Sequence, residues 1–215
     1  MSNDIERRFT VGRVEVRAGD KRTFGGYAAK FDRPSQNLGG FIEVVDRAFF
    51  NKSRGDGWPG VMARYNHDDN MLLGTTQAQT LRLSIDDQGL LYEVDPPQTR
   101  ADVYELVERG DVSKSSFAFV SYEDDWGMSD QGFPMRTLIS GSLRDVAPVN
   151  IPAYEDTSAG LRSLAAKFDA EYEEVRKLAS ANELVRFFKV TDGEQTLAKR
   201  SAAMRLAQAK AIKLS

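Results

Sequence analysis

The sequence predicts a mainly β (α+β) domain at residues 1–160, followed by a charged helical or conditionally disordered tail at residues 161–215. Two observations support this division. Up to about residue 154, short runs of alternating apolar and polar residues are separated by turns rich in Gly, Pro, Asn and Asp, and few segments have helical spacing. After Gly160 the chain is charged, and residues 161–189 lack glycine and proline while their apolar residues recur at helical spacing.

The composition narrows the class of protein. At 215 residues the chain is long enough for one domain with a sizeable core and an appendage. A net charge of -3 gives no bulk electrostatic preference for nucleic acid. The absence of cysteine excludes disulfides, a thiol nucleophile and thiolate zinc sites, and a single histidine excludes a multi-histidine metal centre. No apolar run approaches the roughly 20 residues that a membrane span requires, so we expect a soluble, cytoplasmic protein.

The first half of the chain predicts strands and two hairpins. The extended runs cover residues 9–17, 21–31, 41–45, 61–67, 71–76, 80–86 and 89–94. The first two runs form one predicted hairpin and the last two another. Gly25-Gly26 indicates a bulge or a close backbone approach. Residues 46–50 are predicted to start a short helix with Asp46 as its cap, and residues 51–60 to form a mobile surface loop.

The second half begins with a predicted helix at residues 99–109, with Thr99 as its cap and Gly110 as its stop. The extended runs that follow cover residues 115–122, 135–139 and 143–154, and the acidic, glycine-containing stretch 123–132 is predicted to break the first from the second. The amphipathic stripe at residues 161–189 is interrupted near residues 180–182. Residues 195–214 favour a helix with a basic bias.

The stretch of greatest chemical interest is residues 110–120. If the chain is a strand from about Ser115, alternate side chains face opposite ways. Ser115 then shares a face with Phe117 and Phe119, which marks that face as buried, whereas Ser116 points to the other face among small neighbours. We expect this second face to be exposed. Ser116 is therefore the better candidate nucleophile, although serines at strand starts commonly do no more than hydrogen-bond a turn.

A serine nucleophile needs a nearby base and a third group that orients the base. His67 is the only imidazole in the chain, and the polar turn beside it argues against a core role, although a lone histidine is often structural. Asp145 stands among apolar residues, where an unpaired charge is costly. It is predicted either to pair with Arg144 or another cation, or to accept a hydrogen bond from His67 and complete a base-orienting pair.

Four segments, in order, resemble the prohead or capsid maturation proteases of tailed bacteriophages, which are distantly similar to the herpesvirus assemblin serine proteases. They are GGYAAKFD at residues 25–32, NHD at 66–68, RGDVSKSSFAF at 109–119 and LRDVAPVNIPA at 143–153. The resemblance covers roughly residues 5–160 and implies a closed antiparallel β-barrel flanked by helices. It matches Ser116 to the family's nucleophile, His67 to its histidine and Asp145 to its acidic third member.

The resemblance implies a serine endopeptidase that needs no metal or organic cofactor and cleaves scaffold or propeptide segments of capsid proteins, its own chain included. The implied partners are the major capsid protein with its scaffold segment, the portal protein as a further candidate, and other copies of the chain. The implied location is the immature capsid in the host cytoplasm. Self-cleavage is expected between about residues 161 and 215, in a tail that suits a docking helix. The alternative is a noncatalytic capsid assembly or scaffolding module.

Overall fold

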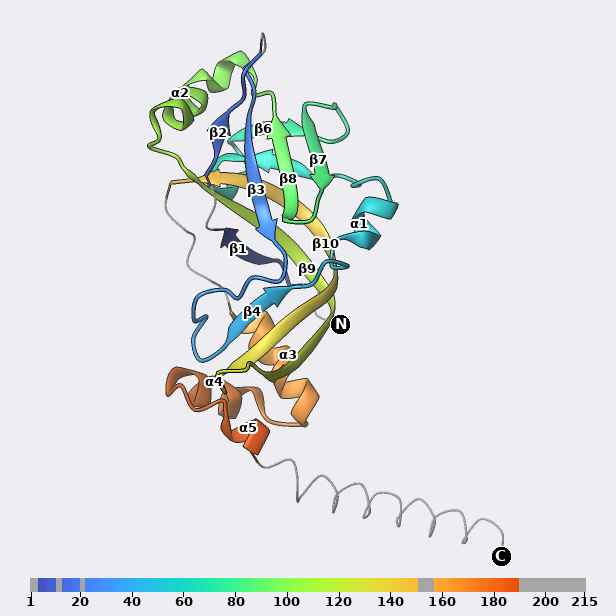
Figure 1. The fold of residues 1–215 in the computed structure, drawn as a ribbon, viewed down its shortest axis with the longest axis vertical. Helices are drawn as coiled ribbons and strands as arrows, with labels where there is room; N and C mark the ends of the chain where they lie inside the picture. Colours follow the sequence, from blue (N-terminus) through green and yellow to red (C-terminus); the bar gives the residue numbers. More distant parts are fainter. Residues whose placement is uncertain (1–3, 11–12, 20–21, 151–156, 190–215) are drawn as a thin grey trace, which may run out of the picture.

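The computed structural model describes residues 4–10, 13–19, 22–150 and 157–189, which form two β-sheets with helices beside them (Figure 1). The strands are β1 (Glu6–Thr10), β2 (Glu15–Val16), β3 (Phe24–Lys30), β4 (Ile42–Val45), β5 (Met62–Arg64), β6 (Leu72–Thr75), β7 (Leu81–Ile85), β8 (Gly89–Val94), β9 (Lys114–Met128) and β10 (Pro134–Val149). The helices are α1 (Asn51–Gly55), α2 (Ala101–Arg109), α3 (Ser158–Phe168), α4 (Tyr172–Ser180) and α5 (Arg186–Lys189), with 3-10 helices at Tyr65–His67 and Gln98–Arg100. The predicted α+β fold, made mainly of strands, is confirmed.

The larger sheet has the strand order β1-β9-β10-β5-β6, and β4 also pairs with β10. Strand β10 is parallel to β4 and β5, whereas β9 is antiparallel to both of its neighbours, β1 and β10. The smaller sheet, β2-β3-β8-β7, is antiparallel throughout. Within the described residues neither sheet closes on itself, since pairing ends at β1 and β6 in one and at β2 and β7 in the other. The closed barrel that the resemblance implies is therefore not confirmed.

The hairpin of β7 and β8 follows the sequence pattern, whereas the first predicted hairpin does so only in part. The run predicted at residues 9–17 begins in β1 of the larger sheet, and β2 near its end pairs with β3. Strands β2 and β3 pair, and β7 pairs with β8 across the turn at residues 86–89. A methyl group at Gly25 would lie 2.0 Å from the Tyr92 carbonyl oxygen, so β3 and β8 approach too closely there for a side chain. The predicted close approach at Gly25 is confirmed.

Strands β9 and β10 form one long hairpin, and the predicted break at residues 123–132 is wrong over its first half. Strand β9 continues to Met128, with shifts in its register to β10 near Glu123, and the chain leaves the strand only at the turn of residues 129–133. The acidic residues in this stretch stay in the strand because they have partners: Asp124 binds Arg136 at 2.6 Å. Trp126 is also buried, against Phe41, with 4.9 Å between the ring centroids.

The main core lies between the two sheets and is rich in phenylalanine. Phe117 and Phe119 of β9 stack with 5.1 Å between their ring centroids, and Phe49 packs edge-on against Phe119 at 5.3 Å. The smaller sheet adds buried side chains such as Tyr92 and Leu90. The alternate residues of β9 predicted to face the core therefore do so.

Two local predictions next to the core are wrong. Residues 51–55 form helix α1 rather than part of a mobile loop, because the Ser53 hydroxyl is buried and accepts a hydrogen bond from the Leu143 N–H of β10 at 3.0 Å. Helix α2 has Arg100 at its N-cap with no side-chain cap, so Thr99 does not cap it. The predicted stop at Gly110 is confirmed, since Gly110 has a φ of 83° in the left-handed region that favours glycine.

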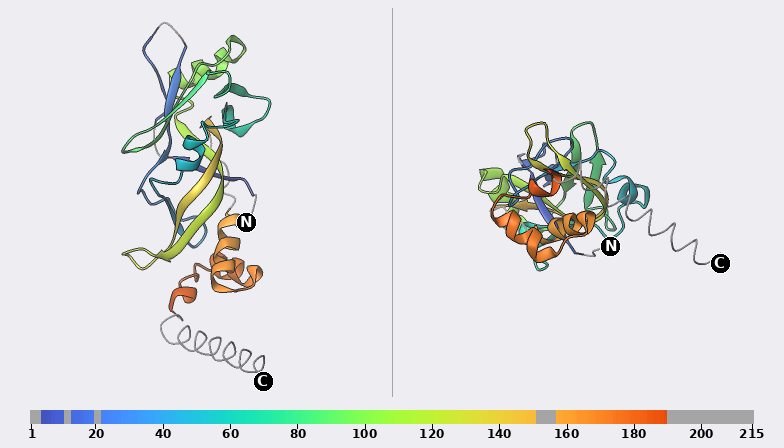
Figure 2. Two further views of the ribbon diagram at one scale, coloured as in Figure 1. Left: turned by 90° about the vertical axis from the view of Figure 1, so that its right-hand side faces the viewer. Right: turned by 90° about the horizontal axis from the view of Figure 1, so that it is seen from below.

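The helices α3, α4 and α5 gather at one end of the β9–β10 hairpin (Figure 2). A second hydrophobic cluster joins them to the strands: Leu164 of α3 and Val175 of α4 are fully buried in it, together with Phe41 and Trp126. Because α3 begins at Ser158, it spans the predicted boundary after residue 160, and this boundary stays a prediction. The predicted helix at residues 195–214 lies outside the described residues.

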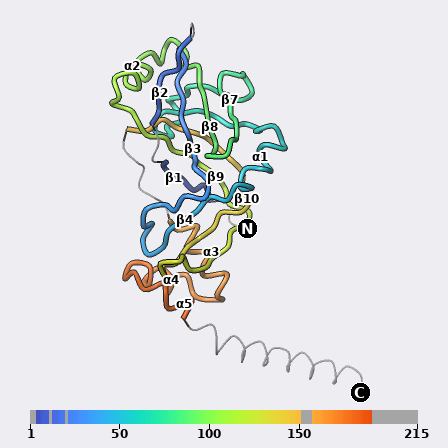
Figure 3. Tube along the Cα trace, in the orientation of Figure 1, coloured from blue at the N-terminus to red at the C-terminus, as the bar shows by residue number. Residues whose placement is uncertain are grey.

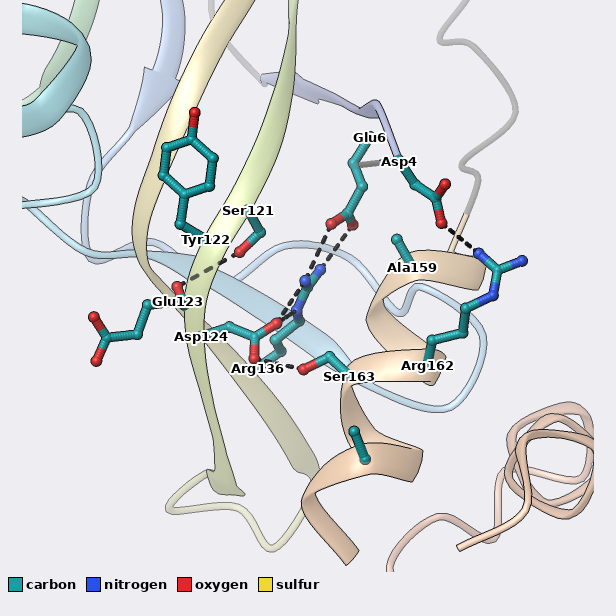
Figure 4. Close-up of a pocket in the computed structure, with 11 residues that line it drawn as sticks. Asp4, Glu6, Ser121, Tyr122, Glu123, Asp124, Arg136, Ala159, Arg162 and Ser163 are labelled. Atoms are coloured by element: carbon teal, nitrogen blue, oxygen red, sulfur yellow. Dashed lines mark hydrogen bonds and ion pairs between the residues drawn. The ribbon is translucent and has the colours of Figure 1, made fainter. Parts of the chain in front are cut away.

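A buried ion network joins β1, β4, β9 and β10. Arg8 binds Glu6 at 2.7 Å and Glu43 at 2.8 Å. Arg136 binds the same two carboxylates at 2.7 and 2.9 Å, and also Asp124 at 2.6 Å. Figure 4 shows Arg136 between Glu6 and Asp124. The network therefore ties β1 to the middle of the larger sheet.

The arginines in this network stay charged although they are buried. Burial by itself lowers the pKa of Arg8 and of Arg136, but the carboxylates of Glu43 and Glu6 outweigh burial and raise it. Removal of the Arg136 guanidinium would leave Glu6 and Glu43 to share Arg8 alone, and would take from Asp124 its cation in this network. Breaking a buried ion pair in this way typically costs roughly 3–5 kcal/mol.

We predict that Arg136→Met lowers the free energy of unfolding by roughly 3–5 kcal/mol, measured by urea unfolding at neutral pH, because Glu6 and Asp124 lose their shared cation. Arg47→Gln is the control. Arg47 pairs with Asp32, and both side chains are more than half exposed (58% and 53%), so its loss should cost at most about 1 kcal/mol. Equal effects of the two replacements would contradict the assigned role of the network.

Candidate active site

Three neighbouring elements bring the candidate residues to one place. Ser116 lies in β9 and pairs with Ala147 of β10, and Asp145 stands two residues before Ala147 on the same strand. On the other side of β10, Met62 of β5 pairs with Asp145, and His67 ends the 3-10 helix that follows β5. Figure 3 shows β9 and β10 side by side through the larger sheet. Strand β10 therefore sets the distance between Ser116 in β9 and His67 in the turn after β5.

The imidazole of His67 bridges the serine and the aspartate. Its Nε2 atom lies 2.6 Å from Ser116 Oγ, and its Nδ1 atom lies 2.5 Å from Asp145 Oδ1. The three residues are buried, with exposed fractions of 8% for His67, 1% for Ser116 and 3% for Asp145. In such an arrangement an aspartate can orient the imidazole, and the imidazole can take the serine proton. The structure thus brings together all three residues that the sequence singled out.

The chain reaches His67 through a turn rather than through the predicted strand, which ends three residues earlier at Arg64. Asn66 and His67 have φ values of 54° and 58°, in the left-handed region that few residues other than glycine adopt. The Asn66 side-chain oxygen accepts a hydrogen bond from the Asn150 backbone N–H at 3.1 Å. This contact ties the turn to the chain just beyond β10, which stabilises an otherwise costly backbone conformation.

Ser115 and Ser116 face opposite sides of β9, as the strand alternation predicts. Ser115 donates a hydrogen bond to the Tyr92 hydroxyl at 3.3 Å, and burial raises the pKa of Tyr92, so this phenol offers no base at neutral pH. Ser116 meets His67 instead. The prediction that Ser116 lies on an exposed face is wrong. Strand β9 is a central strand, and the Ser116 hydroxyl contacts both His67 and the Arg8 carbonyl oxygen.

Asp145 has a different cation beside it from the one named in the sequence analysis. Arg144 is exposed and forms no ion pair with Asp145, whereas Arg64 of β5 places its Nε atom 3.6 Å from Asp145 Oδ2. The carboxylate therefore meets both kinds of partner considered from the sequence. One oxygen contacts the His67 imidazole, and the other faces a cation.

Sequence reasoning missed two groups at this site. The Arg8 carbonyl oxygen accepts a hydrogen bond from the Ser116 hydroxyl at 2.9 Å, and no side-chain pattern can reveal a backbone acceptor. The contact of Arg64 with Asp145 depends on the parallel pairing of β5 with β10, which joins segments about 80 residues apart. The one available signal was that Arg64 lies in the extended run, residues 61–67, that leads to His67.

In the part of the chain that the structure describes, no group of three His, Cys, Asp or Glu side chains is arranged to hold a metal ion. None of the helices in that part has the length and apolar character needed to cross a membrane.

A buried serine within hydrogen-bond distance of an imidazole, itself oriented by an aspartate, is the arrangement of a serine hydrolase. The family model described as caudovirus prohead serine protease matches residues 10–171, a span that includes His67, Ser116 and Asp145. Because the match covers more than half of the 215 residues, the chain belongs to this family and is a serine protease of the phage prohead. Comparisons with curated proteins and with solved structures gave no match.

Membership of this family shows the process in which the protein acts, the class of its partners and its location. The protein acts in capsid maturation, associates with capsid proteins, and is located inside the phage prohead in the host cell. The family match does not by itself assign the side chains that perform the reaction, and the contacts of His67 are the evidence for them.

We predict that Ser116→Ala reduces cleavage of a coexpressed capsid protein precursor to background, because it removes the hydroxyl that contacts His67. Ser115→Ala is the matched control: it removes only a 3.3 Å hydrogen bond to Tyr92, worth about 1 kcal/mol of stability, and should leave cleavage intact. Loss of cleavage in Ser115→Ala with retention in Ser116→Ala would assign the nucleophile to the other face of β9.

Proposed function

We propose that the protein is a serine endopeptidase that cleaves scaffold or propeptide segments from capsid proteins during prohead maturation, with Ser116 as its nucleophile, His67 as its base and Asp145 as the third member of the triad. The observation that carries this proposal is the pair of contacts made by one imidazole. They measure 2.6 Å to Ser116 Oγ and 2.5 Å to Asp145 Oδ1.

In the proposed first step, Ser116 Oγ forms a bond to the carbonyl carbon of the scissile peptide while its proton passes to His67 Nε2. The carbonyl oxygen takes the electron pair, and backbone amides near the nucleophile are the expected donors to this oxyanion. The imidazolium then gives its proton to the leaving amine as the C–N bond breaks. A water molecule hydrolyses the acyl-enzyme by the same route, and the serine regains its proton.

Asp145 acts in this sequence through its contact with His67 Nδ1. The carboxylate accepts the Nδ1–H hydrogen bond, so that Nε2 is left as the proton acceptor facing the serine. It also stabilises the imidazolium that forms after proton transfer. No step of this mechanism needs a metal or an organic cofactor.

The Arg8 carbonyl gives the Ser116 hydroxyl a second acceptor. The hydroxyl has a single proton, which can point to the Arg8 oxygen at 2.9 Å or to His67 Nε2 at 2.6 Å. Only the second orientation leads to attack. The ion network holds β1, and with it the Arg8 carbonyl oxygen, which holds the hydroxyl by a hydrogen bond in the first orientation only.

The noncatalytic assembly module considered from the sequence is not supported, because the chain belongs to a family of serine proteases. The proposed substrate is the major capsid protein with its scaffold segment, and the portal protein is a further candidate partner. The chain itself is a further proposed substrate. We also propose that copies of the chain associate with one another within the prohead.

Self-cleavage is proposed in the C-terminal tail. Cuts inside α3 or α4 would require these helices to unfold, because Leu164 and Val175 are fully buried against the strands. The proposed window of residues 161–215 therefore narrows to its later part, beyond α4, which ends at Ser180.

We predict that purified wild-type protein loses a C-terminal segment while Ser116→Ala stays at full length, and that the shortened product retains α3 and α4. Intact-mass measurement of the two proteins after identical incubation decides this. A wild type that cleaves capsid protein but keeps its full length would contradict self-cleavage. Equal shortening of both proteins would point to a contaminating protease and also contradict it.

A further inference from the structure

The Asp145 carboxylate is buried and needs a compensating positive charge. It is 3% exposed, and burying an ionised carboxylate without a charged or strongly hydrogen-bonded partner is costly. The His67 imidazole must be neutral at rest to act as a base, so it supplies a hydrogen bond but no charge. The permanent cation beside the carboxylate is Arg64, whose Nε atom lies 3.6 Å from Oδ2.

Arg64 is held in place by contacts on either side of its guanidinium. Its Nη1 atom forms an ion pair with Asp69, and its Nη2 atom lies 3.7 Å from Met62 Sδ. The pairing of β5 with β6 shifts register between Ala63 and Arg64, and such irregularities re-aim a side chain. With only 15% of its side chain exposed, Arg64 is partly shielded from solvent screening.

We propose that Arg64 is a positioning residue for the His67–Asp145 pair, with Asp69 as its anchor; this inference rests on the proposed function of the triad. The guanidinium keeps Asp145 ionised and holds Oδ2, so that Oδ1 stays directed at His67 Nδ1. The imidazole is thereby kept in the orientation that presents Nε2 to Ser116.

The position of the charge also predicts how activity depends on pH. Among the described residues, the polar groups that contact the His67–Asp145 pair are the Arg64 guanidinium from β5 and the Ser116 hydroxyl from β9. Strand β1 contributes the Arg8 carbonyl oxygen, which contacts Ser116 rather than the pair. Arg64 is the charged one among these groups. Because this charge lies beside the pair that exchanges a proton with Ser116, its removal is expected to change the pH profile of the reaction.

The test uses the full-length protein and the rate at which a fluorophosphonate probe reacts with it, measured from pH 5 to pH 9. We expect Arg64→Met to react about 10- to 100-fold more slowly at its optimum, because the imidazole is less well oriented. We also expect the acid limb of its pH profile to move, because the charge beside the His67–Asp145 pair is gone. Arg64→Lys keeps the charge, so its acid limb should stay in place and its rate should recover in part.

Two further variants separate positioning from a general structural effect. Arg144→Met removes an exposed arginine next to Asp145 that forms no ion pair with it, and it should change neither the rate nor the acid limb. Asp69→Asn removes the anchor but leaves Arg64, so the rate should fall by less than in Arg64→Met. A lower rate in Arg64→Met with an unmoved acid limb would overturn the proposal. An Arg64→Lys protein no better than Arg64→Met would overturn it as well, and this comparison holds even if the methionine variant folds poorly.

The Asp145→Asn variant distinguishes a wrong role for Arg64 from a wrong assignment of the triad. If Asp145→Asn and Ser116→Ala lose reactivity while Arg64→Met keeps both its rate and its acid limb, the triad stands and the role of Arg64 is refuted. If Asp145→Asn reacts like the wild type, the triad itself is wrong, and the role proposed for Arg64 is refuted with it.

Discussion

The pairing of β10 with β9 on one side and with β5 on the other is the constraint on which the site depends. Ser116, Asp145 and His67 come from segments far apart in the chain, and only this pairing brings them within 2.6 Å of one another through the imidazole. The register decides the outcome, because a shift of one residue in β9 would turn Ser116 away and present Ser115 or Phe117 instead. The phenylalanines of β9 prevent that shift, since they fill the core on the opposite face.

The buried ion network gives β1 a fixed place beside the nucleophile strand. Strand β1 is a five-residue strand at a sheet edge, and besides its pairing with β9 its Glu6 and Arg8 are held by Arg136 and Glu43. The same Arg136 binds Asp124, which accepts a hydrogen bond from Ser163 of α3 at 2.5 Å. The charges that position the Arg8 carbonyl next to Ser116 thus extend to the C-terminal helices, and the site and those helices share one structural support.

Much of the site could be predicted from the sequence because strand alternation is a local property. Two phenylalanines spaced two residues apart were enough to separate Ser115 from Ser116. Exposure could not be predicted in the same way, since the burial of Ser116 depends on β1, more than 100 residues away in the sequence. The charged stretch around Asp124 was wrongly predicted as a break for the same reason: its partner Arg136 is on the other strand of the hairpin. The position of Arg64 beside Asp145 is also a product of sheet pairing alone.

The central claim is that His67 makes Ser116 the single reactive serine of this chain. Peptide mass mapping after reaction with a fluorophosphonate probe tests it directly, because the adduct identifies the activated hydroxyl without any knowledge of the substrate. The account predicts one adduct, on Ser116, in the wild type, and none in His67→Ala. An adduct on another serine, or one on Ser116 that forms equally fast without His67, would contradict it.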